Sequence, residues 1–264
     1  MKYRYLLLTL AAASLSVSLR AQGTTNDMET DLGIRTSVGI DYKVTKGFHL
    51  NAEYEMRTGD NVSKIGRHQI SLGGEYKIAP WLKAGLSYTY FENQGKKHWK
   101  PRHRVSGDLT FGWKAGDWKL SVKEQLRLTH KDDINVYPQP RNSLALKSRF
   151  KAQYNGWGAW RPYGLVELRN ALNDASVTAT WSTADEAYGS YEFGGYSTAY
   201  VNRVRGGAGL LWKINKQNSI DFYALLDYCY DKDIDVSSDY TTLISLTWDQ
   251  TLCPIIGIGY KFSF

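Results

Sequence analysis

The chain has 264 residues, with 33 Lys and Arg against 26 Asp and Glu, and a formal net charge of +7. Aromatic residues make up 14% of the chain, yet its mean hydropathy is −0.44. Beyond the amino-terminal segment there is no apolar run of roughly 20 residues, which excludes a polytopic helical membrane protein. The aromatic content also excludes a disordered chain, and the length suits one large all-β domain.

The amino-terminal segment, residues 1–21, has the features of a secretory signal peptide. Lys2 and Arg4 form a charged start, Leu6–Val17 is largely apolar, and Ala21 is a small residue before the expected cleavage point. Removal of this segment lowers the number of Lys and Arg from 33 to 30 and the net charge from +7 to +4. Nearly half of the apparent basicity therefore belongs to the expected signal peptide.

The remaining residues, 22–264, are expected to form one domain, and from Asp31 onward their apolar and polar side chains alternate. This period of two indicates strands with one apolar face. Each segment is about ten residues long, the length that a tilted strand needs to cross a bilayer. The segments are Leu32–Lys43, Phe48–Arg57, Gln69–Ile78, Trp81–Phe91, Arg104–Lys114, Trp118–Thr129, Leu144–Tyr154, Pro162–Arg169, Arg203–Ile214, Ile220–Tyr230 and Ile255–Phe264.

Two observations favour a transmembrane barrel over a soluble β-sandwich, whose strands also alternate. Short connections take turns with long ones, as in barrels with short periplasmic turns and long extracellular loops. Aromatic residues also gather on the apolar face beside the short connections, where a girdle at the membrane interface would lie. The predicted girdle consists of Tyr42, Phe48, Tyr76, Trp81, Trp113, Trp118 and Trp212.

We therefore expect an all-β, antiparallel up-and-down transmembrane barrel of ten to twelve strands. Eleven segments are evident, but single-chain bacterial barrels have even numbers, so twelve is preferred and one closing strand is left unplaced. Tyr240–Trp248 also alternates and is expected in a long hairpin above the membrane.

The carboxy-terminal strand ends on an aromatic face. Tyr260, Phe262 and Phe264 share that face, and the pattern resembles the signal by which outer-membrane barrels are recognised for insertion. The sequence thus predicts export to the outer membrane of a Gram-negative bacterium, with membrane lipid and the barrel-assembly machinery as partners.

Several stretches resemble an uncharacterised family of outer-membrane barrels common in Bacteroidota, the domain of unknown function 2490. They are Gly33–Gly47, Ala52–Asn61, Pro101–Phe111, Lys119–His130, Ser143–Tyr154, Arg161–Leu168 and Ile255–Phe264. The resemblance implies the barrel fold and its location and no particular activity. The chain departs from the family at Asn170–Ala199 and Tyr240–Cys253, which look like enlarged outer loops.

The inward face of the expected barrel is rich in charge. The basic candidates are Arg35, Arg104, Lys123, Arg127, Lys147, Arg149, Lys151, Arg203 and Arg205, and the acidic candidates are Glu53, Glu55, Glu75, Asp108, Glu167 and Asp221. Pairs between acidic and basic walls could fill the lumen, as side chains do in small barrels. This structural barrel with a salt-bridged interior is the preferred interpretation. The alternative is a narrow path for small anionic solutes.

We expect no enzyme activity, and the sequence has no motif for a cofactor, a metal ion or nucleic acid. A lipid-modifying hydrolase is the alternative, because Glu124 breaks the pattern by facing lipid, with Ser148 expected near it and Gly107 opposite it. His103 would lie about 13 Å away along the strand, too far for a triad. A bulge is the simplest explanation of the outward carboxyl.

Two further features leave alternatives open. The enlarged loops carry Trp181, Tyr188, Tyr191 and Tyr196, so the outer surface could instead bind an external partner or a glycan. Cys229 and Cys253 would meet at the outer rim if their strands are neighbours, either as free thiols or as a disulfide. A disulfide is permitted in an oxidising compartment and would stabilise the fold by roughly 3 kcal/mol.

Overall fold

The computed structural model describes residues 24–95, 97–132, 138–184, 186–237 and 242–264. The expected signal peptide, residues 1–21, lies outside these residues. All regular structure in the described residues is β-strand. No part of the described chain forms a helix of the length and apolarity needed to span a membrane.

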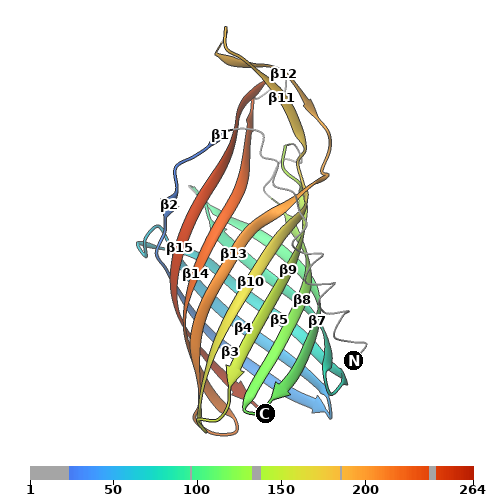
Figure 1. Cartoon of the computed structure of the whole chain (residues 1–264), viewed down its shortest axis with the longest axis vertical. Helices are drawn as coiled ribbons and strands as arrows, with labels where there is room; N and C mark the ends of the chain where they lie inside the picture. The colour runs from blue at the N-terminus through green and yellow to red at the C-terminus, as the bar shows by residue number, and fades with distance from the viewer. Residues whose placement is uncertain (1–23, 96, 133–137, 185, 238–241) are drawn as a thin grey trace.

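Eleven long strands close into a barrel (Figure 1). Each pairs antiparallel with the next along the chain. They are β3 (Gly33–Thr45), β4 (Phe48–Gly59), β5 (Lys64–Ala79), β6 (Leu82–Gln94), β7 (Trp99–Ala115), β8 (Trp118–Lys131), β9 (Asn142–Tyr154), β10 (Trp160–Asp174), β13 (Thr198–Lys213), β14 (Asn218–Val236) and β15 (Leu243–Ser263).

The alternation of the sequence places apolar side chains on the outside of the barrel and polar ones inside. On the outside, Val38 is 56% exposed, Leu86 65% and Ile256 63%. On the inside, Glu167 is 3% exposed and Asp227 2%. This distribution is the reverse of the one in a soluble protein, where large apolar side chains are the ones removed from solvent.

The barrel closes where β15 meets β3, and this pair is parallel. The register runs over nine positions, from Gly33 opposite Ile255 to Asp41 opposite Ser263. The preferred number of twelve strands is not found, because eleven strands make up the described barrel. The first and last strands run in the same direction, so they can pair in parallel without a further strand between them.

The seam continues above the barrel along two short strands. β1 (Thr24–Thr25) pairs in parallel with Thr247–Trp248 of β15. β2 (Glu29–Thr30) pairs in parallel with Thr251–Leu252 of the same strand. Thr24 therefore lies far up the side of β15 (Figure 1).

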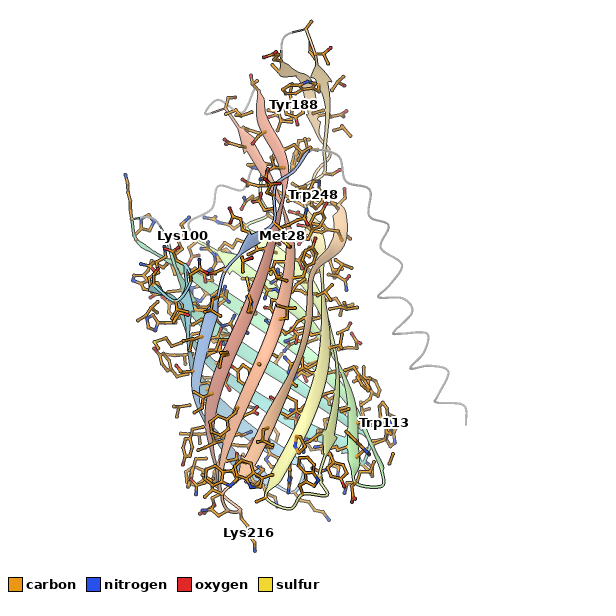
Figure 2. The ribbon with its side chains drawn as sticks, turned by 60° about the vertical axis from the view of Figure 1, so that its left-hand side comes forward. Met28, Lys100, Trp113, Tyr188, Lys216 and Trp248 are labelled. Atoms are coloured by element: carbon orange, nitrogen blue, oxygen red, sulfur yellow. The ribbon has the colours of Figure 1, made fainter. Side chains whose placement is uncertain are left out.

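Connections of unequal length distinguish the two ends of the barrel. At the short-turn end, β3–β4, β5–β6 and β7–β8 are each joined by two residues, and the carboxy terminus lies there too (Figure 1). Gly47 and Gly116 have φ values of 93° and 59° in two of these turns, a conformation that favours glycine. Figure 2 shows Trp113 and Lys216 at this end, with Tyr188 and Trp248 at the opposite, long-loop end.

A second, smaller core lies above the barrel at the long-loop end. The upper halves of β14 and β15 form a hairpin there, and β11 (Val177–Ser182) pairs with β12 (Ala187–Phe193) as another. The buried residues of this core are Ala175, Val177, Ile234, Leu243 and Leu246, with Tyr188, Tyr191, Phe193 and Tyr196 packed against them.

This upper core changes the interpretation of the enlarged loops. The described part of Tyr240–Trp248 belongs to a long hairpin, as expected, but it continues without a break into the closing strand. Three of the loop tyrosines pack inward against the core, and Trp181 remains 51% exposed. These three tyrosines therefore contribute to the packing of the upper core and are partly buried in it.

The parallel closure predicts which residues can be cross-linked. In a background with Cys229→Ser and Cys253→Ser, the pair Ser37→Cys and Gly259→Cys should form a disulfide, because a Cβ at Gly259 would lie 2.8 Å from the Ser37 Oγ. The cross-link is measured as a mobility difference between reduced and non-reduced protein on a gel. The control pair Gly39→Cys and Gly259→Cys, offset by two residues in the register, should not form one. A twelfth strand between β3 and β15 would abolish the first cross-link.

Candidate functional site

Buried charged side chains are concentrated inside the barrel. A cavity of about 600 Å³ occupies it. The structure places on its wall all nine basic candidates, Arg35, Arg104, Lys123, Arg127, Lys147, Arg149, Lys151, Arg203 and Arg205. It also places there all six acidic candidates, Glu53, Glu55, Glu75, Asp108, Glu167 and Asp221.

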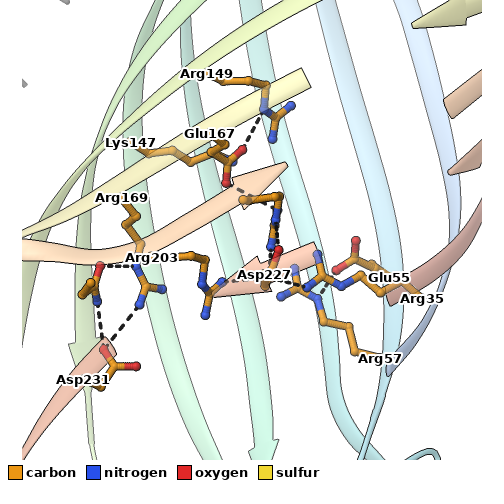
Figure 3. A network of polar contacts seen from close by, with 12 residues as sticks. Arg35, Glu55, Arg57, Lys147, Arg149, Glu167, Arg169, Arg203, Asp227 and Asp231 are labelled. Carbon is orange, nitrogen blue, oxygen red and sulfur yellow. Dashed lines mark hydrogen bonds and ion pairs between the residues drawn. The ribbon is translucent and has the colours of Figure 1, made fainter. Parts of the chain in front are cut away.

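On one wall, Glu167 is surrounded by cations (Figure 3). Its carboxylate accepts hydrogen bonds from Lys147 Nζ at 2.8 Å and Arg149 Nε at 2.7 Å, and Arg205 Nη1 lies 3.4 Å away. Arg149 and Arg205 stand directly opposite Glu167 on the neighbouring strands β9 and β13. Cross-strand neighbours of opposite charge stabilise such a pairing.

Asp227 on β14 is the second centre of this wall. It accepts a hydrogen bond from Arg205 Nη2 at 2.6 Å, and Arg35 Nη2 lies 3.4 Å away. Arg203 Nη1 is more distant, at 3.9 Å (Figure 3). Because Asp227 is 2% exposed, the charge-assisted hydrogen bonds replace the water that the carboxylate loses on burial.

The other charged residues also pair along the wall. Lys123 lies 3.1 Å from Asp108 on the adjacent strand, and Lys83 lies 2.6 Å from Glu75. Arg57 donates a hydrogen bond to Glu55 two residues before it. Lys151 and Asp221 both contact Tyr163, Lys151 over its ring and Asp221 through its hydroxyl. Most of these pairs join residues of the same or neighbouring strands, and Arg35–Asp227 reaches one strand further. Pairing along the wall is therefore the pattern among the described residues, in place of the expected pairing between opposite walls.

A second cavity, of about 370 Å³, lies toward the long-loop end. The described residues that line both cavities are Arg67, Arg104, Arg127 and Arg169. We call these four residues the arginine layer. The two cavities meet at these side chains.

Each member of the arginine layer is held by a neutral oxygen. Arg67 Nε donates to Asn93 Oδ1 at 2.6 Å, Arg104 Nε to Thr129 Oγ1 at 3.0 Å, and Arg127 Nε to Gln125 Oε1 at 2.8 Å. Arg169 Nε donates to Asn202 Oδ1 at 2.7 Å, and its Nη2 lies 3.7 Å from Asp231.

Several charged lumen residues were not among the sequence candidates. They are Arg57, Arg67, Arg169, Asp227 and Asp231. Arg67 lies between the predicted segments Phe48–Arg57 and Gln69–Ile78, whereas β5 begins at Lys64 and includes it. Arg57, Arg169 and Asp227 lie within the predicted segments and have the parity of the inward candidates, so parity alone would have found them. Asp231 follows when the segment Ile220–Tyr230 is extended by one residue.

The predicted girdle residues lie near the short-turn end and contact further aromatic rings. Trp81 stacks on Phe111 with ring centroids 6.2 Å apart, and Trp212 stacks on Trp160 at 5.0 Å. Trp118 lies 5.2 Å from Tyr154. Of the other members, Tyr42, Tyr76 and Trp113 are 52%, 54% and 39% exposed, while Phe48 is half-buried.

The carboxy-terminal aromatic residues belong to this same ring. Phe264 contacts Tyr42 edge to face at 5.9 Å and Phe262 at 4.7 Å. The Tyr260 hydroxyl donates a hydrogen bond to Asn218. The chain end is thus packed into the aromatic row.

The two cysteines lie on neighbouring strands and both thiols are free. Cys229 stands opposite Thr251, and Cys253 stands opposite Asp227, so the two are offset by two positions. The two thiols nevertheless lie in hydrogen-bond contact across this diagonal, so the strands bring the cysteines together as expected, here as free thiols.

Glu124 does face outward, but no bulge lies beside it. Its register neighbours are Leu109 and Ser148, not Gly107, and neither strand pair shifts there. Ser148 Oγ donates a hydrogen bond to the carboxylate at 2.6 Å. This partner, rather than a bulge, satisfies the outward acid.

The histidines of the outer rim form a separate cluster. His103 contacts the Tyr88 hydroxyl at 2.6 Å and Asp132 at 3.5 Å, and His130 contacts Asp132 at 2.9 Å. In the described part of the chain, no group of three or more His, Cys, Asp or Glu is arranged to hold a metal ion.

Removal of the Glu167 charge should destabilise the barrel. Glu167→Gln leaves Lys147, Arg149 and Arg205 without the carboxylate that they share, which costs about 3 kcal/mol for a buried pair. We expect a lower urea midpoint, measured by heat-modifiable gel migration of the detergent-solubilised protein. The control Glu75→Gln removes a more exposed acid paired only with Lys83, and its loss should stay below about 1 kcal/mol. Equal losses in the two variants would contradict a central role of Glu167.

Comparison with known proteins identifies a family. No curated protein matches the sequence. Among solved structures, the anion-selective porin from Comamonas acidovorans is similar at 13% identity, with a TM-score of 0.35 over 83% of this chain. The chain spans 57% of the length of that porin. The family model described as "Protein of unknown function (DUF2490)" matches residues 33–237, and the chain belongs to that family.

Proposed function

We propose that the protein is an outer-membrane barrel whose lumen forms a narrow, anion-leaning passage for small solutes. The proposed role is non-enzymatic. Its partners are membrane lipid, the barrel-assembly machinery during insertion, and a small anionic solute. The short-turn end faces the periplasm and the long-loop end faces the exterior.

The exposed apolar surface supports placement in a membrane. Leu72, Leu86, Val166 and Ile256 are each more than half exposed on the outside of the strands. A soluble monomer rarely exposes a continuous apolar surface of this kind. The aromatic row at the short-turn end has the position of an interfacial girdle.

The arginine layer is the single observation that carries the proposed passage. An ion moving between the two cavities must pass Arg67, Arg104, Arg127 and Arg169. Fixed positive charge in a narrow lumen lowers the energy of an anion there and raises that of a cation. Glu167 and Asp227 are each paired with several cations, which balance their negative charge.

A closed structural barrel is the second candidate. It is favoured by the many ion-paired side chains that occupy the inner wall, among them those around Glu167 and Asp227. In that case the polar interior would serve stability alone. The two candidates differ in whether ions cross.

Conductance distinguishes the two candidates. In planar bilayers under a salt gradient, the wild type should show single-channel events and a reversal potential of the sign expected for anions. Arg104→Gln with Arg127→Gln should lower the anion preference severalfold, because two positive charges leave the layer. Lys46→Gln, on an exposed turn outside the lumen, should change neither quantity. Absence of channel events in the wild type would leave only the closed barrel.

The parallel seam predicts where the amino-terminal strands lie. An epitope inserted after Asp27 should be labelled by antibody on intact cells, because β1 and β2 lie beside the upper part of β15. An epitope at the Gly116 turn should be labelled only after the outer membrane is permeabilised. The reverse pattern would mean the opposite orientation, and labelling of neither epitope in intact cells would contradict an exterior amino end.

A further inference from the structure

Phe91 is an apolar residue on the polar inner face of the barrel. It comes from β6 and is 2% exposed. The guanidinium carbons of Arg67 and Arg104, from the strands on either side, lie over its ring at 4.7 and 4.4 Å from the centroid. One ring therefore orients two cations through cation–π contacts.

The hydrogen bonds of these arginines leave their outer nitrogens free. Arg67 and Arg104 each use Nε for a neutral acceptor, as does Arg127 on the next strand. Among the described residues, no carboxylate lies within ion-pair distance of these three side chains, and no hydrogen bond involves their Nη nitrogens. These nitrogens are also not among the fully buried atoms that lack a partner, so they face the water of the cavities.

The arginines on β9 and β13 differ from these three, because they have a carboxylate partner on β10. Arg149 and Arg205 contact Glu167 at 2.7 and 3.4 Å. Arg104, by contrast, is close enough to both Arg67 and Arg127 for charge repulsion. The charge of Glu167 reaches Arg127 from beyond ion-pair distance, whereas the charges that act on Arg67 and Arg104 are those of other arginines. Like charges held together in a partly desolvated site are costly. A bound anion would remove that cost.

The geometry of the free nitrogens indicates what kind of anion fits. A guanidinium with its Nε anchored presents two Nη groups in a fixed plane, which suits an acceptor with two or more oxygens. A spherical ion such as chloride gains the charge but cannot make paired hydrogen bonds.

We propose that Arg67, Arg104 and Arg127 form a binding site for an oxyanion, a phosphate or carboxylate group on a small solute, where the two cavities meet. Phe91 positions two of the three guanidinium groups. The site rests on the proposed function only in that an anion must enter the lumen from water. It does not require that the anion crosses.

Calorimetric titration of the detergent-solubilised wild-type protein with inorganic phosphate, at fixed ionic strength in chloride, tests the site. We expect saturable binding with about one phosphate per chain. Sodium acetate as a second probe identifies a preference for phosphate or carboxylate, and either oxyanion binding in excess chloride supports the proposal. Absence of saturable binding for both would overturn it.

Two matched variants separate a built site from diffuse charge. Arg67→Lys keeps the positive charge but loses the planar fork and the stacking on Phe91, and it should raise the phosphate Kd about tenfold. Lys123→Gln removes a lumen charge that Asp108 already balances, and it should change the Kd less than about twofold. If Arg67→Lys binds like the wild type, or Lys123→Gln weakens binding equally, the defined site is wrong.

A gel assay of heat-modifiable migration confirms that each variant is folded before titration. Phe91→Leu provides an independent test, since it leaves every charge in place and removes only the ring. It should weaken phosphate binding as well. Phosphate binding without channel events would support the oxyanion site and refute the passage. Channel events without phosphate binding would support the passage and refute the site.

Discussion

The pairing of β3 with β15 is the contact on which the rest of the barrel depends. An open sheet would leave two strand edges whose N–H and C=O groups have no partners. In the membrane location proposed above, each such group would cost several kcal/mol of free energy. The seam pairs both edges over nine positions. Parallel pairs are slightly weaker per residue than antiparallel ones, and β1 and β2 lengthen this pair above the barrel.

Closure brings all inward faces together, and the charges inside are divided unevenly. Glu167 and Asp227 gather the cations of β9, β13 and β3 into pairs that follow the wall. The wall made by β5, β7 and β8 presents arginines with neutral partners. Ion pairs between neighbouring strands can brace a barrel without crossing it. The lumen is therefore polar and braced by ion pairs, and it still contains cavities of about 600 and 370 Å³.

The alternation of the sequence was enough to predict the direction of each inward side chain, because parity along a strand is a local property. Pairing between strands is not local, and it was predicted less well. Glu124 stands opposite Leu109 rather than Gly107, a shift of two residues that keeps the face and changes the neighbour. The free nitrogens of Arg67 and Arg104 depend on such neighbours, so the sequence could not reveal them. The even-number rule for bacterial barrels also led to the wrong preference, since it takes an antiparallel closure for granted.

The odd number of strands has a consequence for how the protein is assembled. A barrel with an even number of strands can insert as a series of hairpins, with both chain ends left on the side of entry. Here one strand has no such partner, and β1 and β2 lie at the end of the barrel opposite Phe264. With the orientation proposed above, the polar stretch that includes Asp27, Glu29 and Asp31 has to be carried through the bilayer. In that orientation, biogenesis would include translocation of a charged amino-terminal segment as well as insertion of strands.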